Sequence, residues 1–436
     1  MVYDVIIGRD IADKERFGER GLIFIGKGYV KMGNYTSLSN KIWLDVARSH
    51  VVLVAGKRGS GKSYTLGAIA EELSDLKDEA SKNVASLIFD TMGIFWTMKF
   101  KNEKDKELLD QWELKSKSLP VKVFIPFGKE KEYREKLIPF DETFALKTSE
   151  LEAEDWITMF NLKMTSLEGV LLVRIISELQ GKKDEFAIMD IQDAIEKDVR
   201  SSENTKEVVS ALFSAADNWG IFAKGEGGTE INDLVNPGTT TVLDVSIYSS
   251  VGAFNVRALV ISLISRKIFE TRMDARKREE LEALQHGQDY LAYKSERKEP
   301  LVWIFIDEVH EFLPKDWKTP ATDALVQLLR EGRQPGISLV MATQQPGQIH
   351  KDVMTQSDIV ISHRVTAKPD IEALNEIMQT YLLKDIKQQI DDLPALKGSA
   401  IILDDNSERI YPVRVRPRFT WHGGEAPSAV MADVQF

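Results

Sequence analysis

The chain has 436 residues, of which 43% are hydrophobic and 29% are charged, as in ordinary globular proteins. This composition excludes a disordered, collagen-like or disulfide-stapled protein, and the absence of cysteine also excludes thiolate metal sites and cysteine nucleophiles. The formal net charge of −11 argues against a surface covered by nucleic acid, but it leaves room for a locally basic groove or channel.

No stretch of the sequence approaches the about 18 consecutive apolar residues that a membrane helix needs. The segment that starts at Met1 lacks the basic start and the apolar run of a secretory leader. We therefore expect a cytoplasmic protein with no membrane partner.

Residues 1–45 contain short β-rich runs separated by Gly, Asn and Ser. Because the segment is too short for a large core, we predict a small N-terminal barrel-like domain or an appended sheet. The stretch from Gly26 to Gly28 is typical of a tight hairpin connection.

Buried strands alternate with helices over residues 46–99 and 236–415, which predicts an α/β core with a parallel sheet. The run from His50 to Ala55 is continuously apolar, as in a strand buried on both faces, and a helical pattern starts at Lys62. Further core strands are predicted at Val84 to Asp90, Thr239 to Val245, Leu301 to Asp307, Ile337 to Ala342, Ile359 to His363 and Ser399 to Leu403.

Charged amphipathic helix patterns dominate residues 100–235, and one strand-like piece, Val121 to Pro126, interrupts them. We predict a mainly helical insertion in the core here. Residues 416–436 form a C-terminal tail.

The segment from Gly56 to Ser63 matches G-x-x-x-x-G-K-[ST] between a predicted strand and a predicted helix. In such a loop, the backbone N–H groups and the helix N-terminus bind phosphates. Lys62 would contact the β- and γ-phosphates of ATP, and the Ser63 hydroxyl would bind Mg²⁺. A glycine-rich turn that matches by chance is the alternative. The candidate nucleotide-binding residues are Gly56, Arg58, Gly59, Ser60, Gly61, Lys62, Ser63 and Tyr64.

Two adjacent carboxylates, Asp307 and Glu308, follow the apolar strand that starts at Leu301. Asp307 would hold Mg²⁺ through water, and Glu308 would orient or deprotonate the attacking water. A kinase for small molecules does not need the second acid, so the pair favours ATP hydrolysis. A charged cap where a strand ends is the alternative.

Four further polar residues are candidates for the reaction. Gln344, with Gln345 as second choice, follows a core strand and would contact the γ-phosphate, unless it is an ordinary amide in a loop. Arg330 and Arg333 end a predicted helix, where cations offset the helix dipole. Their functional interpretation is an arginine finger, acting in a neighbouring subunit, and the sequence does not choose between them.

The long interval between Lys62 and Asp307 requires a large insertion between the two motifs. Only one complete phosphate loop is present, which argues against a two-lobed helicase, although Asp307 to His310 resembles a DExH box. The absence of a Leu-Ser-Gly-Gly-Gln stretch disfavours a transporter-type ATPase. A single core that carries a finger needs a partner subunit, which indicates a ring.

Several segments together resemble the HerA branch of the FtsK–HerA superfamily of ring-shaped ATPases that pump DNA. The resemblance covers most of the chain, and its motifs are Asn40 to Ser63, Phe89 to Phe95, Leu234 to Ser246, Asp307 to Phe312, Gly332 to Pro346 and Pro417 to Gly424.

The resemblance implies a RecA-like P-loop core, an N-terminal barrel and a helical insertion between the two nucleotide motifs. It also implies a homohexamer that uses ATP and Mg²⁺, threads double-stranded DNA through a central channel and works with a nuclease or another effector. Two alternatives stay open. One is a ring scaffold that activates a bound effector, as in antiviral defence, and the other is a secretion or genome-packaging ATPase.

Overall fold

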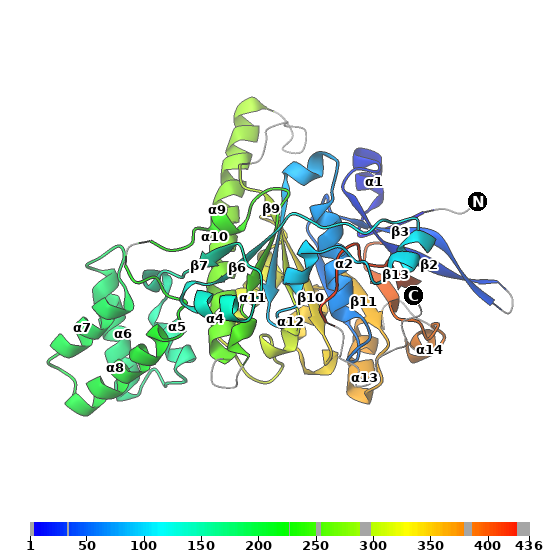
Figure 1. The fold of residues 1–436 in the computed structure, drawn as a ribbon. Helices are drawn as coiled ribbons and strands as arrows, with labels where there is room; N and C mark the ends of the chain where they lie inside the picture. Colours follow the sequence, from blue (N-terminus) through cyan, green and yellow to red (C-terminus); the bar gives the residue numbers. More distant parts are fainter. Residues whose placement is uncertain are drawn as a thin grey trace.

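The computed structural model describes residues 4–32, 35–225, 227–249, 254–287, 298–378 and 386–424. Within them, one sheet of thirteen strands forms the centre of the molecule, with a helical lobe at one side (Figure 1). The strands are β1 (Val5–Ile7), β2 (Leu22–Met32), β3 (Tyr35–Asp45), β4 (Val51–Ala55), β5 (Val84–Asp90), β6 (Val121–Pro126), β7 (Glu142–Phe144), β8 (Thr240–Asp244), β9 (Leu301–Ile306), β10 (Ile337–Thr343), β11 (Ile359–His363), β12 (Ser399–Asp404) and β13 (Arg409–Val415). The α-helices are α1 (Ile11–Phe17), α2 (Lys62–Ser74), α3 (Lys106–Gln111), α4 (Glu130–Glu135), α5 (Ala153–Met159), α6 (Leu167–Gln180), α7 (Ile188–Lys197), α8 (Glu203–Asp217), α9 (Ile231–Leu234), α10 (Phe254–His286), α11 (Thr322–Glu331), α12 (Lys351–Gln356), α13 (Lys368–Met378) and α14 (Ile386–Asp391).

The middle of the sheet is parallel. Its order is β1-β3-β2-β13-β12-β11-β4-β10-β9-β5-β8-β6-β7, and every pairing from β11 to β7 is parallel. All residues of β4, β5 and β10 are buried, as their continuous apolar runs predict. The predicted α/β core with a parallel sheet is therefore confirmed.

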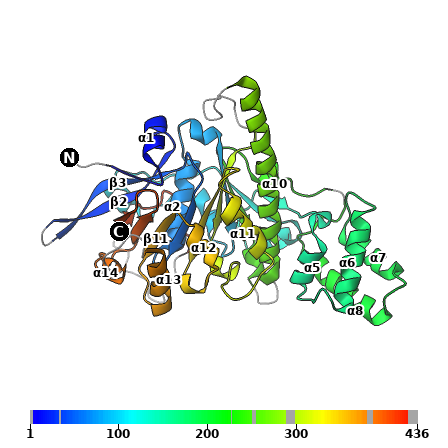
Figure 2. The ribbon, with the colours of Figure 1, turned by 180° about the vertical axis from the view of Figure 1, so that it is seen from behind.

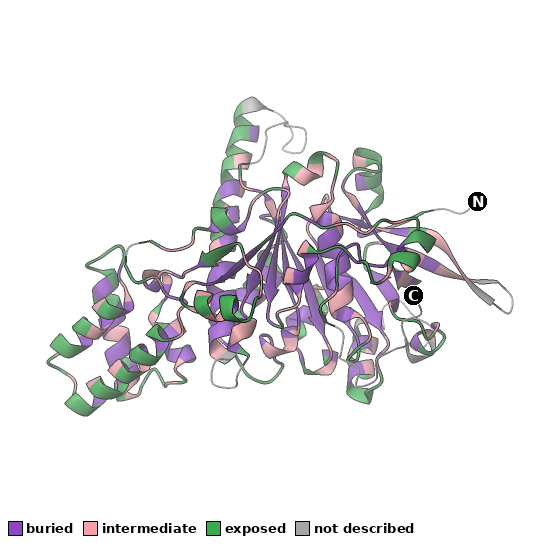
Figure 3. Ribbon diagram, in the orientation of Figure 1, coloured by how far each residue is buried: buried purple, intermediate pink, exposed green. Residues whose placement is uncertain are grey.

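Helices cover both faces of this sheet (Figure 2). Alternate residues of β4 face opposite sides, so Val52 and Val54 belong to the apolar cluster that contains Leu66 of α2. Val51 and Leu53 belong to the second cluster, which contains residues of α10 and α11. The strands between these two layers form the buried centre of the molecule (Figure 3).

The N-terminal strands extend the same sheet. The β2–β3 hairpin pairs with β13 through β2, and β1 pairs with β3, so this segment is the appended sheet and the predicted barrel is not confirmed. The predicted hairpin turn at Gly26 to Gly28 is wrong, because β2 runs through these residues with register shifts. Gly26 has a different role: a Cβ there would lie 2.3 Å from the carbonyl oxygen of Arg414, so only glycine lets β13 pair this closely.

The predicted insertion has two parts. Its strand-like piece is β6, which pairs with β8 and β7 and so lengthens the core sheet. Helices α5 to α8 form the lobe beyond this edge (Figure 1). In the lobe the buried Trp156 ring lies 4.8 Å from Phe213 and 5.2 Å from Phe222, measured between ring centroids. An apolar centre of this kind lets the lobe hold its shape beside the core.

Candidate active site

The carboxyl ends of three neighbouring parallel strands bring the predicted motifs together. Thr343 at the end of β10 pairs with Ala55 at the end of β4, and Met341 pairs with Ile306 at the end of β9. The phosphate loop, the two carboxylates and Gln344 therefore leave the sheet at one edge. Crevices at the carboxyl ends of parallel strands are the usual place for ligands in α/β sheets.

The phosphate loop has the backbone that its glycines allow. Gly59 and Gly61 have φ angles of +74° and +109°, and Gly61 caps the N-terminus of α2. A Cβ on Gly56 would lie 2.4 Å from Ser60 Oγ and 2.8 Å from Cβ of His363, so that position also needs glycine. The result is an exposed loop at the start of a helix of 13 residues, which suits an anion.

Lys62 is the first residue of α2 and is almost fully buried. Its ammonium donates to the carbonyl oxygen of Lys57 at 3.4 Å, and its charge opposes the rise that burial causes in the pKa of both Asp307 and Glu308. By contrast, the Arg58 and Gly59 positions are exposed at the tip of the loop. The lysine charge thus lies between the loop and the carboxylates, where a γ-phosphate would lie.

Asp307 is buried beside Ser63. One carboxylate oxygen, Oδ1, accepts the Glu308 N–H at 2.9 Å, whereas Oδ2 is buried without a hydrogen-bond partner among the described residues. Burial raises the pKa of Asp307, and the Ser63 hydroxyl and Lys62 oppose this rise. A free carboxylate oxygen next to a serine hydroxyl is a donor set that fits Mg²⁺, which is usually held by one or two protein ligands together with phosphates and water. In the described part of the chain, no group of three or more His, Cys, Asp or Glu side chains forms a separate metal cluster.

Glu308 adopts a strained backbone conformation with φ +50°. Burial and the neighbouring Asp307 raise its pKa to about 7, and its Oε2 is a buried atom without a hydrogen-bond partner in the described structure. His310 Nδ1 lies 3.4 Å from this oxygen, but burial lowers the pKa of His310 to about 4, so the imidazole is neutral. A carboxylate with a pKa near neutrality suits a general base.

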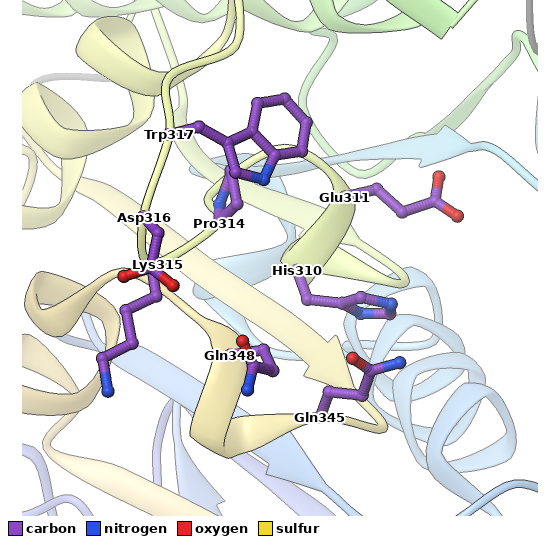
Figure 4. A pocket seen from close by; sticks show the side chains of 8 residues that line it. All are labelled: His310, Glu311, Pro314, Lys315, Asp316, Trp317, Gln345 and Gln348. Atoms are coloured by element: carbon purple, nitrogen blue, oxygen red, sulfur yellow. The ribbon is translucent and has the colours of Figure 1, made fainter.

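Gln344 and Gln345 differ in their exposure and in the groups beside them. A hydrogen bond from the Gln344 backbone opposes the rise in the pKa of Glu308, which places Gln344 against the carboxylate, and the Gln344 side chain is half-buried. Gln345 is exposed and lines a separate cavity of about 560 Å³ together with His310 and Trp317 (Figure 4). Of the two residues, Gln344 is therefore the one that lies beside Glu308.

Arg330 and Arg333 are not near the phosphate loop of their own chain. Arg330 lies in the last turn of α11, and Arg333 lies between α11 and the start of β10, so both lie at the opposite edge of the sheet. Arg330 Nε donates to Asp352 at 2.7 Å, and Arg333 donates to the Gln356 carbonyl at 2.6 Å. Their side chains are 55% and 45% exposed, so both can reach a neighbouring molecule.

Sequence reasoning missed two supports of the loop. His363, at the end of β11, is buried behind the loop, where its Nε2 lies 2.9 Å from Thr65 Oγ1 and its Nδ1 lies 3.0 Å from the Ser399 carbonyl. Burial lowers the pKa of His363 to about 4. A lone histidine at a strand end carries no signal of this role.

The second support is the tail. The Arg418 N–H donates to the hydroxyl of Tyr64 at 2.6 Å, and burial raises the pKa of this tyrosine to about 12. The Tyr64 side chain therefore faces the tail. The sequence contains a signal for this support, the tail motif Pro417 to Gly424, but the motif alone predicts no role for it.

Comparison with known proteins agrees with this arrangement. The family model described as the central domain of helicase HerA matches residues 30–268, and the model of zonular occludens toxin matches residues 254–368. The DNA double-strand break repair helicase HerA of Pyrococcus furiosus is 27% identical over 216 residues, which cover 46% of this chain and 36% of that protein. The HerA of Sulfurisphaera tokodaii is 20% identical over 380 residues, which cover 86% of this chain and 67% of that protein.

A solved structure shows the shared fold. VirB4 of Thermoanaerobacter pseudethanolicus aligns with a TM-score of 0.55 at 12% identity, over 92% of this chain and 97% of that one. The chain thus spans about a third of the length of the Pyrococcus relative but nearly all of this structure. No helix among the described residues is long and apolar enough to cross a membrane.

Proposed function

The chain belongs to the HerA helicase family, since the family model covers more than half of it, and on this basis we propose that it is an ATP-hydrolysing ring motor that translocates on double-stranded DNA. The observation that carries the proposal is a set of buried polar atoms without partners among the described residues. Ser60 Oγ, Asp307 Oδ2 and Glu308 Oε2 all belong to the phosphate loop or to the adjoining strand end. Other buried atoms without partners are scattered through the described structure, but these three gather at one place beside the loop, which supports a site for a phosphate-bearing ligand.

The reaction follows from the positions of these groups. The loop N–H groups and Lys62 would hold the phosphates of ATP, and Ser63 and Asp307 would bind Mg²⁺, which neutralises charge on the phosphates. Glu308 would take a proton from the attacking water, because its raised pKa lets it accept a proton near neutral pH. Gln344 would contact the γ-phosphate and report its loss to β10.

The position of the two arginines supports a ring. Since Arg330 and Arg333 lie at the opposite edge of the sheet from their own loop, they would complete the site of a neighbouring subunit. We propose a homohexamer in which one of them stabilises charge on the γ-phosphate in trans. DNA would pass through the central channel, and a nuclease or another effector would be the partner. The net charge of −11 then requires that basic groups be concentrated in the channel.

The test compares three variants. Glu308→Gln should lose ATP turnover by about 100-fold or more while it retains nucleotide binding, because only the proton acceptor is removed. Lys62→Ala should lose both binding and turnover. Glu207→Gln, which changes an exposed glutamate of α8, is the matched control and should behave as the unaltered protein.

DNA dependence decides between a motor and a scaffold. The turnover of the unaltered protein should rise when long duplex DNA is added. Stimulation only by a partner protein would instead support an effector-activating scaffold. Normal hydrolysis by Glu308→Gln would overturn the catalytic assignment.

A further inference from the structure

A cavity of about 450 Å³ opens from the phosphate loop on the side away from the carboxylates. The loop contributes Gly61, Lys62, Ser63 and Tyr64 to its wall, whereas Asp307, Glu308 and Gln344 are not among its lining residues. The γ-phosphate end of a nucleotide must point to the carboxylates. Its other end must therefore point into this cavity, whose volume is typical of a small-molecule site.

One wall of the cavity is the C-terminal tail, which is fixed to the same helix as the loop. Both oxygens of the buried Glu71 on α2 accept from the tail: Oε2 from Arg416 at 2.9 Å and Oε1 from Arg418 at 3.0 Å. The Phe419 and Thr420 N–H groups also donate to Glu71, at 2.9 and 3.0 Å. The tail is thus held rigidly beside Lys62, as a preformed wall.

The opposite wall is α3 with the segment that precedes it. Leu108 and Trp112 line the cavity from this side. Asn102 connects this wall to the tail, because its N–H donates to the Phe419 carbonyl and its side-chain amide donates to the Arg418 carbonyl, both at 3.0 Å. The two walls therefore form one bonded unit.

The chemistry between these walls suits a flat heterocycle. Leu108, Trp112 and Pro417 present apolar surface, and the His422 ring packs edge-on against Tyr64 at 5.3 Å between centroids. Arg418 Nη1 lies 3.2 Å from His422 Nδ1, which leaves Nε2 of the neutral ring as the N–H donor. Burial, together with the Arg418 charge, lowers the pKa of His422 to about 3, so the ring carries no charge near neutral pH.

We propose that this cavity, between the tail and α3, binds the base and sugar of the nucleotide, and that Leu108 and His422 determine its affinity for the nucleoside half. The assignment rests on the proposed function, because it requires the triphosphate to lie on the loop. It gives the tail a direct part in substrate binding, in addition to its structural contacts with α2.

Inorganic tripolyphosphate separates the two halves of the site, since it can occupy the phosphate loop but has no nucleoside. Dissociation constants for ATP and for tripolyphosphate would be measured by calorimetry on the full chain. Leu108→Glu and His422→Ala should each weaken ATP binding by about tenfold or more and leave tripolyphosphate binding unchanged. Leu137→Glu, at a side chain that is 89% exposed, is the matched control for the added charge and should change neither constant.

The outcomes are distinct. Unchanged ATP binding in both variants overturns the nucleoside assignment, as does a parallel loss of ATP and tripolyphosphate binding in variants whose thermal unfolding is unaltered. If Leu108→Glu does not fold, His422→Ala decides, because this side chain is only half-buried. Failure of the unaltered protein to bind either ligand would instead refute the proposed function.

Discussion

Two buried clusters of charge lie along the same helix, α2, and they differ in how completely they are satisfied. At its N-terminus, Lys62 faces Asp307 and Glu308, which retain carboxylate oxygens without hydrogen-bond partners in the described chain. Further along the helix, Glu71 is enclosed by Arg416 and Arg418, and both of its oxygens are bonded.

The pKa shifts of the two clusters have opposite signs. Burial raises the pKa of Asp307 and of Glu308, and the available charges do not compensate it. Burial also acts to raise the pKa of Glu71, but the charges of Arg418 and Arg416 outweigh it and leave the pKa below its ordinary value. The comparison teaches that removing a partner from the bonded Glu71 cluster should cost stability, whereas carboxylates that retain free oxygens, as Asp307 and Glu308 do, are candidates for a ligand site.

The largest expected effect is a loss of stability when the cluster of Glu71, Arg416 and Arg418 is broken. Glu71→Gln keeps the shape of the side chain but leaves two buried arginines without their counter-charge. The free energy of unfolding should fall by about 3–5 kcal/mol. Urea unfolding measures this loss, with Glu207→Gln as the control at an exposed site. A loss below about 1 kcal/mol would show that the tail does not depend on the ion pairs.

The next effect tests which arginine acts across a subunit boundary. Arg330→Ala or Arg333→Ala, whichever is the finger, should lower ATP turnover by about 100-fold. Mixed with Lys62→Ala subunits, that variant should recover part of the activity, because each intact loop then meets an intact arginine from its neighbour. Lys351→Ala removes an exposed cation next to Asp352, the partner of Arg330, and should leave turnover unchanged. An absence of rescue for both arginines would contradict a trans finger.

A smaller effect is the pH dependence of stability that arises from Glu308, in the cluster of Lys62, Asp307 and Glu308. The folded protein holds a proton on Glu308 up to about pH 7, whereas the unfolded chain releases it near the ordinary glutamate pKa of 4.5. Stability should therefore fall as the pH rises through this window, by about 2 kcal/mol. Glu308→Gln has no such proton and should reduce the fall. Urea unfolding at pH 5 and pH 8 measures the difference, and an equal fall in both proteins would refute the assigned pKa.

The core of the fold could be predicted because its signals are local. Each buried strand is a continuous apolar run, so the predicted His50 to Ala55 differs from β4 by one residue, and Val121 to Pro126 coincides with β6. The phosphate loop and the two acids are equally local, and parallel strands bring such strand ends to one edge.

The features of the fold and of the site that the sequence did not predict depend on contacts between residues far apart in the chain. Glu71 is an unremarkable residue of a helix in the sequence, and its burial arises only because the tail folds over it. Gly26 suggested a turn, yet its small size serves the approach of β13, which lies far along the chain. Local patterns carry no record of such pairings, so the cavity between the tail and α3 and the order of the strands at the edge of the sheet could not be predicted.

The smallest expected effect concerns His50, a buried histidine whose positive charge is balanced by two carboxylates. Buried His50 lies between Asp358, 2.7 Å from Nδ1, and Asp45, 3.3 Å from Nε2. Burial acts to lower the pKa of His50, but these two carboxylates outweigh it and raise the pKa to about 9. Each of these carboxylates also has an arginine partner: Arg9 bonds to Asp45, and Arg333 lies 3.7 Å from Asp358. The imidazole therefore shares the negative charge of both carboxylates with an arginine.

Since the folded pKa of His50 exceeds its ordinary value of 6.5, the added stability is complete below pH 6.5 and is lost as the pH rises through 9. The free energy of unfolding should fall by about 1 kcal/mol over this window. The fall is small because His50 titrates as part of one interacting set with Asp45 and Asp358. His50→Gln should remove most of this fall, whereas His350→Gln, outside this network, should preserve it. Urea unfolding at pH 6 and pH 9.5 measures both. A fall that survives in His50→Gln would mean that the histidine is neutral and that the three groups are held by hydrogen bonds alone.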